Sequence, residues 1–238
     1  MRARHVPRII LLTHLLALKK RLYPSRGFTL VELLVVITII LVLAGVITPV
    51  GRGMMARSRT INCSTNLRQI GTATMLYAAE NNMTLPQTSH ERGGKSWTLT
   101  LHAILQPYSD ETLTFKCSED EDRHRDRTYV LNDFLTKEPS GADHLNFSIL
   151  AKINRPESTF MFAEAAVSQT GDHFHFAPYY GGKIPPGAFE KQVATAAHGE
   201  KANYLFTDGH VETLTRKETQ SRLAEKNSRF VDPSGGIP

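Results

Sequence analysis

A chain of 238 residues with a formal net charge of +5 has room for one or two domains. The charge is unevenly distributed, because residues 1–27 hold seven of the Lys and Arg residues and no acid, so the side chains of residues 28–238 sum to −2. The basic composition therefore gives no reason to expect nucleic acid as a partner. Residues 51–238 are numerous enough for one sizeable hydrophobic core.

The basic leader is followed by a long apolar segment. Between Phe28 and Val50 the only charged residue is Glu32. About 20 apolar residues cross the hydrocarbon of a bilayer as a helix, which satisfies every backbone polar group internally. Lys and Arg before the first apolar span keep that end in the cytoplasm. We therefore expect one transmembrane helix over 28–50, with the rest of the chain across the inner (cytoplasmic) membrane.

The stretch Gly27-Phe28-Thr29-Leu30-Val31-Glu32, between this leader and the apolar run, resembles the signature of type IV prepilins and type II secretion pseudopilins. The resemblance implies that a prepilin peptidase removes residues 1–27 by cutting between Gly27 and Phe28, and that the new amine of Phe28 is methylated. The alternative is a plain signal anchor or secretory signal. Against it, no small-x-small cleavage site follows the run, which is also longer than the apolar core of a signal peptide.

Glu32 is the candidate assembly residue, because a carboxylate in an apolar segment costs several kcal/mol and is by default functional. In the processed chain its nearest cation would be the α-amine of Phe28, about one helical turn away. The amine of a neighbouring subunit would serve as well and would set the stagger between helices. Alternatively, Glu32 extends to the headgroups without a functional partner.

Residues 51–82 are expected to continue the long helix outside the membrane. Steps of four and three residues, which place side chains on one face of a helix, separate Cys63, Leu67, Ile70, Thr74 and Tyr77. Gly71 weakens this segment without forbidding a helix, and Asn81-Asn82 with Pro86 end it.

The patterns within residues 83–216 predict an α+β domain. Helical spacing recurs between Trp97 and Tyr108, and short strands are expected at 128–131 and 158–163. Strand-like runs at 202–207 and 210–214 flank Asp208-Gly209, which predicts a hairpin with a two-residue type I′ turn. In that register Phe206 pairs with Val211, and Tyr204 with Thr213. Residues 217–238 are expected to be a polar tail. The overall expectation is a pilin-like α+β fold with a small antiparallel sheet.

Both cysteines, Cys63 and Cys117, fall on the expected extracytoplasmic side, where disulfides persist. A bond between them would close a loop of more than 50 residues, worth about 4 kcal/mol in the chain-entropy model. Two buried free thiols are the alternative.

A second resemblance lies near the C-terminus. His198, nine intervening residues and Asp208-Gly209 resemble the H-x9-DG motif of a prepilin-like family. The structural interpretation is that Asp208-Gly209 makes a turn and His198 packs nearby. The alternative is a metal site built from His198, Asp208, His210, His173 and His175, or a calcium site using Asp172 and Asp208. No spacing matches a zinc pattern and no EF-hand loop occurs, so we expect no metal and no cofactor.

These patterns favour an assembly subunit rather than an enzyme, since no nucleophile elbow or phosphate loop occurs. By resemblance its partners are other pilin-like subunits, a prepilin peptidase and an inner-membrane assembly platform. Fibres of this kind serve secretion, adhesion, motility or DNA uptake, and the resemblance applies equally to all four. The alternative is a membrane-anchored extracytoplasmic domain that binds a ligand or metal and does not polymerise.

Overall fold

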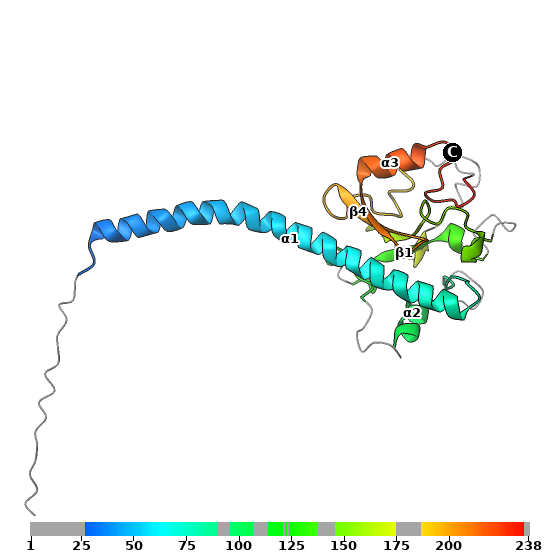
Figure 1. Ribbon diagram of the computed structural model, residues 1–238. Coiled ribbons are helices and arrows are strands. Elements are labelled where there is room, and N and C mark those ends of the chain that lie inside the picture. Colours follow the sequence, from blue (N-terminus) through cyan, green and yellow to red (C-terminus); the bar gives the residue numbers. More distant parts are fainter. Residues whose placement is uncertain are drawn as a thin grey trace, which may run out of the picture. The chain divides into compact units, whose positions relative to one another are not determined.

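The computed structural model describes residues 27–89, 96–106, 114–120, 122, 124–137, 146–174 and 187–235, apart from the side chains of 48–50 and 52. The chain forms two units, Met1–Thr48 and Pro49–Pro238. Helix α1 (Leu30–Glu80) begins in the first unit and ends in the second, and it runs without a break through the two segments, 28–50 and 51–82, for which the sequence predicts helix (Figure 1).

In the first unit, α1 is apolar and exposed on all sides. The window Leu30–Ile47 has a mean hydropathy of 3.1, and none of it is buried. The Thr38 hydroxyl donates to the carbonyl of Leu34 at 2.6 Å, so this polar group is satisfied within the helix. Length and composition fit a membrane anchor.

The second unit contains a five-stranded sheet in the order β3-β1-β2-β4-β5. The small antiparallel sheet that the sequence predicts is confirmed, with one exception: β1 and β3 are parallel. The strands are β1 (Tyr129–Asn132), β2 (Phe160–Glu164), β3 (His173–Phe174), β4 (Lys201–Phe206) and β5 (Val211–Thr215).

Each face of the sheet packs on its own hydrophobic core. On one face, Leu67 and Ile70 of α1 pack with Trp97 of α2 (Trp97–Leu105), Phe162 and Leu205. α2 corresponds to the helix expected around Trp97, and the predicted end at Pro107-Tyr108 lies outside the described residues. Figure 1 shows this part of α1 and α2 on one side of the sheet and α3 (Arg216–Ala224) on the other.

The opposite core is aromatic. Phe160 packs against Phe174, Phe189, Tyr204 and Phe230, with ring centroids 4.9–6.1 Å apart. Tyr204 faces this core whereas its neighbour Leu205 faces the other, as the two-residue period of a strand requires. The sheet is therefore buried on both faces.

The hairpin between β4 and β5 lies where the sequence predicts it, but its register differs by one residue. Leu205 pairs with Val211 and Asn203 with Thr213. The loop has three residues instead of two: the Gly209 amide donates to the Phe206 carbonyl at 2.9 Å, and the Phe206 amide donates to that of His210 at 2.8 Å. Gly209 has φ +92°, so it supplies the left-handed residue that closes a three-residue hairpin loop.

The segment 217–238, for which the sequence predicts a polar tail, contains most of helix α3 and a buried apolar pair. α3 begins with a capping box, in which the Thr215 hydroxyl accepts from the Glu218 amide and the Glu218 carboxylate accepts from the Thr215 amide. The hydrogen bond from the Thr215 amide to the carboxylate, and next to it the one from the Thr215 hydroxyl, lower the pKa of Glu218. Phe230 and Val231 beyond the helix are buried, and the Val231 carbonyl accepts from Asn132 at 2.8 Å. The apolar pair anchors the segment against the aromatic core.

At Gly71, α1 packs closely against Leu205 of β4. A Cβ at this position would lie 3.0 Å from Cδ1 of Leu205 and 3.2 Å from Cδ2. Gly53, also in α1, has nothing within 4 Å of such an atom. Only the first glycine is therefore required by packing.

We predict that Gly71→Val destabilises the folded domain by about 1–3 kcal/mol, the usual cost of overpacking a core. The matched Gly53→Val should cause no loss, since valine has the better helix propensity and meets no neighbour there. Thermal unfolding of the full-length protein in detergent measures both, and equal effects would contradict the role assigned to Gly71.

Candidate functional site

The Gly27-Phe28 junction lies directly before α1. Phe28 is 75% exposed, and nothing lies within 4 Å of a Cβ placed on Gly27. The basic leader residues 1–26 lie outside the described residues. Among the described residues nothing covers the junction, as access for a peptidase requires.

Glu32 forms a capping box with Thr29 at the start of α1. Its Oε2 accepts from the Thr29 amide at 2.9 Å and from the Thr29 hydroxyl at 2.8 Å, and its own amide donates to that hydroxyl at 3.2 Å. Sequence reasoning missed this role, although Thr-x-x-Glu before an apolar run is the signature of a capping box. The box satisfies amides that a helix start otherwise leaves unpaired.

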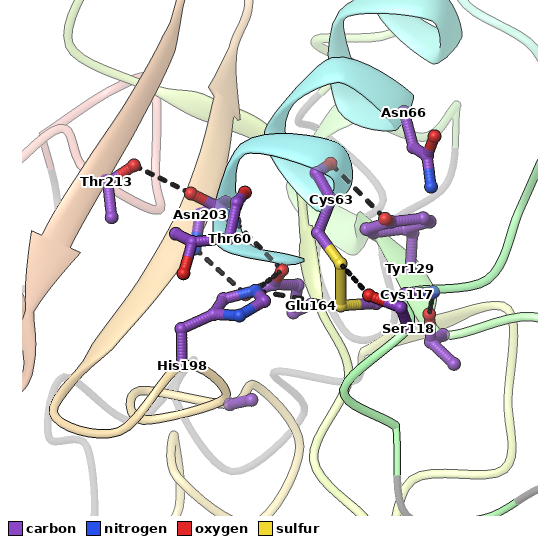
Figure 2. A network of polar contacts seen from close by, with 12 residues as sticks. Thr60, Cys63, Asn66, Cys117, Ser118, Tyr129, Glu164, His198, Asn203 and Thr213 are labelled. Atoms are coloured by element: carbon purple, nitrogen blue, oxygen red, sulfur yellow. Dashed lines mark hydrogen bonds and ion pairs between the residues drawn. A yellow bond between two sulfur atoms is a disulfide. The ribbon is translucent and has the colours of Figure 1, made fainter. Parts of the chain in front are cut away.

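In the domain, a buried polar network is centred on Glu164, at the end of β2 (Figure 2). Glu164 and His198 have side chains that are each 2% exposed, and His198 Nε2 lies 2.7 Å from Glu164 Oε1. The Asn203 amide donates to Oε2 at 2.9 Å, and the Asn203 side chain donates to Oε1 at 3.1 Å. Three donors thus compensate for the desolvation of one carboxylate.

Asn203 extends the network to two further elements. Its side-chain oxygen accepts from the Thr213 hydroxyl of β5 at 2.7 Å, and its side-chain nitrogen reaches the Thr60 carbonyl of α1 at 3.4 Å. The Glu164 network therefore links α1 with three adjacent strands.

A disulfide between Cys63 of α1 and Cys117 borders this network, with the two Cα atoms 5.1 Å apart. The His198 Nε2 is 3.6 Å from the Cys117 sulfur. Tyr129 donates to the Cys63 carbonyl at 3.3 Å, and both burial and the nearby charge of Glu164 raise the pKa of Tyr129, which keeps its proton available. Disulfide, acid and imidazole are thus in contact (Figure 2).

His198 sits in the turn that leads into β4, where its amide donates to the Lys201 carbonyl at 2.8 Å. Asp208 and Gly209 lie beyond the far end of the same strand. The nine-residue spacing therefore corresponds to the remainder of that turn, the length of β4 and the first loop residue after it. The two halves of the motif do not form one site.

The other proposed ligands are also separated. Asp208 Oδ1 is 2.5 Å from His210 Nδ1 in the hairpin loop, whereas Asp172 Oδ1 is 2.7 Å from His173 Nδ1 at the β3 edge. Burial of Asp172 opposes its ionisation, but hydrogen bonds from His173 and Ser89 hold its pKa well below the usual range. His175 lies outside the described residues. The structure does not bring the predicted ligand set together.

A cavity of about 510 Å³ opens beside the disulfide. Its lining includes Cys117, Glu164, Arg216 and the small residues 194–197. Arg125 forms another wall, held by two hydrogen bonds to Asp120 of 2.6 and 3.1 Å. The Glu164 network is therefore reached from the surface through a cavity with both polar and apolar walls.

Sequence reasoning identified His198, Cys63 and Cys117 but missed Glu164 and Asn203. Glu164 follows the apolar run of β2, so an acid at the end of a buried strand was the one available signal. Asn203 lies inside a strand-like run, and no neighbouring residue in the sequence indicates a partner for its side-chain amide.

Comparison with known protein families matches residues 23–48 to the prokaryotic N-terminal methylation motif. The matched segment contains the Gly27-Phe28 junction, Glu32 and most of the apolar part of α1. No curated protein and no solved structure gave a significant match. The motif indicates a type IV pilin-like protein that is processed as a prepilin, and proteins of this class are structural subunits.

We predict that His198→Ala lowers the stability of the disulfide-bonded protein by about 1–3 kcal/mol, because Glu164 loses one of its buried hydrogen bonds. His210→Ala is the matched control and should cost less, since its side chain is 37% exposed. Adding calcium or zinc to the oxidised protein should leave the melting temperature unchanged. A metal-dependent rise that disappears in His198→Ala would contradict this structural role.

We also predict that Cys63 and Cys117 are bonded to each other in exported protein. Peptide mapping without reductant, after trapping of free thiols by an alkylating agent, should recover the two peptides linked. Reduction should lower the free energy of unfolding by about 4 kcal/mol for a loop of this length. Alkylated thiols at both positions would refute the bond.

Proposed function

We propose that this protein is a pilin-like assembly subunit, a pseudopilin or minor pilin of a type II secretion or type IV pilus-like system. The observation that carries the proposal is the methylation motif over residues 23–48, which ends in an apolar helix fit to span a membrane. On this proposal the helix anchors the protein in the inner membrane and packs with other pilin-like subunits in a fibre.

The exposed surface of the anchor supports this proposal. Every described residue of α1 from Leu30 to Ile47 is exposed, so its apolar side chains are not buried by the described part of the chain. Lipid would cover them before assembly, and the helices of neighbouring subunits would cover them in a fibre. The domain beyond the anchor has its own two cores and needs no such partner.

The capping box at Glu32 is compatible with a role in assembly. The hydrogen bonds to Thr29 use Oε2 of the carboxylate. The donors are a neutral amide and a neutral hydroxyl, so they orient the carboxylate without neutralising it. A cation is still needed in lipid, and the α-amine created at Phe28 by processing, in the same or a neighbouring subunit, would provide it.

The first test is the N-terminus of the mature protein. We expect intact-mass spectrometry of membrane-extracted protein to give a chain that starts at Phe28 with a methylated amine. Gly27→Arg should leave the precursor uncut, because a long side chain cannot enter a subsite for glycine. A mature chain with any other N-terminus would refute prepilin processing.

The second test separates pairing of Glu32 from capping. Glu32→Gln retains an oxygen that can accept from Thr29, whereas Glu32→Val abolishes the cap as well as the charge. If charge pairing drives assembly, both variants should insert and be cut after Gly27, yet fail to form cross-linked oligomers in vivo. If capping alone matters, Glu32→Gln should assemble like the wild type and only Glu32→Val should fail. Wild-type oligomer levels from Glu32→Val would exclude both roles.

The cavity beside Glu164 favours a second candidate, an anchored extracytoplasmic domain that binds a small ligand and does not polymerise. At about 510 Å³ it lies within the size range of ligand sites. The same cross-linking experiment distinguishes the two, because a processed protein that stays monomeric at native levels favours the binding domain.

A further inference from the structure

We propose that Cys63, Cys117, Glu164 and His198 form a zinc site when the disulfide is reduced. We call these four residues the Cys–Glu–His cluster. Their donor atoms, two sulfurs, a carboxylate oxygen and an imidazole nitrogen, all lie within 4.8 Å of one another. This inference goes beyond the assembly function and does not depend on it.

The geometry is already close to that of a tetrahedral site. Zinc bonds of about 2.0–2.3 Å place neighbouring ligand atoms roughly 3.3–3.7 Å apart. The distance from His198 Nε2 to the Cys117 sulfur, 3.6 Å, is in this range, and the 2.7 Å contact between His198 and Glu164 needs to open by about 0.6 Å. Once the S–S bond is cleaved, rotation of the two cysteine side chains can separate the sulfurs.

The four ligands come from four separate segments that the fold holds independently. Cys63 lies in the buried face of α1, and the Cys117 amide bonds Thr128 Oγ1 at 2.5 Å. Glu164 ends β2, and His198 is fixed by the hydrogen bond of its amide to Lys201. The disulfide is therefore not the sole contact that holds these positions together.

The surroundings provide outer-shell contacts for one of the four ligands, Glu164. Asn203 donates twice to Glu164 and is itself oriented by Thr213, which leaves the carboxylate in a defined position. His198 Nδ1 is buried and has no hydrogen-bond partner among the described residues, so the imidazole is held by its backbone and by the contacts of Nε2.

The donor set selects the metal. Two thiolates with one imidazole suit zinc and disfavour magnesium and calcium, which prefer oxygen ligands. Cys117 and Glu164 also line the 510 Å³ cavity, which gives the ion and a reductant a route to the cluster. Zinc and the disulfide are mutually exclusive, because the same two sulfurs take part in both.

The chemistry balances with a dithiol as reductant. The dithiol transfers two electrons and two protons to the Cys63–Cys117 bond, which yields two thiols and an oxidised, disulfide form of the reductant. Zinc then replaces the two thiol protons, which leave to solvent. Exchange with a disulfide oxidant reverses the reaction: the two electrons from the thiolates pass to the oxidant's S–S bond, the Cys63–Cys117 bond re-forms, zinc is released, and the oxidant takes two protons from solvent and leaves as a dithiol.

The test compares oxidised and reduced full-length protein in detergent. After reduction and anaerobic buffer exchange, titration with zinc in competition with a chromogenic chelator should show one bound ion per chain, and oxidised protein should show none. Zinc K-edge absorption on the reduced wild type should show two sulfurs at about 2.3 Å and two nitrogen or oxygen atoms at about 2.0–2.2 Å. Equal binding by oxidised protein, no binding by reduced protein, or any other coordination would overturn the proposal.

Variants test the individual ligands. His198→Ala and Glu164→Gln should each weaken zinc binding to reduced protein at least about 10-fold, the lower end of losses seen for outer-shell changes alone. The matched His210→Ala should bind zinc like the wild type. Unchanged affinity in both ligand variants would mean that the thiolates bind alone, and would overturn the four-residue site. If reduced protein unfolds without metal, zinc should restore its circular dichroism, and failure to do so would also overturn the proposal.

Discussion

The buried carboxylate of Glu164 is the constraint on which the arrangement of the domain depends. A carboxylate removed from water destabilises the fold by several kcal/mol unless donors surround it. Its donors come from His198, before β4, and from Asn203 within β4. Because Asn203 also contacts α1 and β5, the requirement to satisfy one acid fixes how the long helix, β2 and the hairpin meet. The disulfide fastens α1 to the same place by a covalent bond.

The parts of the fold that could be predicted from the sequence have local signals. The apolar run and the steps of three and four residues indicate α1, and Asp208-Gly209 marks the hairpin. Glu164 has no such signal, since its partners are 34 and 39 residues away and an acid after a strand looks like any strand end. His198 could be identified from the motif spacing, but its partner could not. That spacing encodes the path through a strand, not the contact that the histidine makes.

The errors have the same physical origin. Asp-Gly fits both a two-residue and a three-residue hairpin loop, and the choice between them shifts every cross-strand pair by one residue. The predicted register would have removed Thr213 from Asn203, and with it part of the Glu164 network. Phe230 and Val231 stand among polar residues, so their burial depends on an aromatic surface formed by distant Phe160 and Phe206. In this C-terminal segment, the Thr215–Glu218 capping box at the start of α3 is encoded locally.

The same capping box occurs twice, and the surrounding solvent decides whether the charge of its glutamate is stabilised. At α3 the Glu218 carboxylate is exposed to water, which solvates its charge once the amides are capped. At α1 the box of Thr29 and Glu32 begins a helix whose next residues fit the hydrocarbon of a bilayer. Neutral donors satisfy hydrogen bonds there but leave the full charge, and lipid provides no counterion. On the proposed processing, cleavage at Gly27 places a cationic amine within one turn of that charge. The cleavage that removes the leader would thereby also neutralise the charge of Glu32 in the anchor. This gives a physical reason for an acid so near the cleavage site.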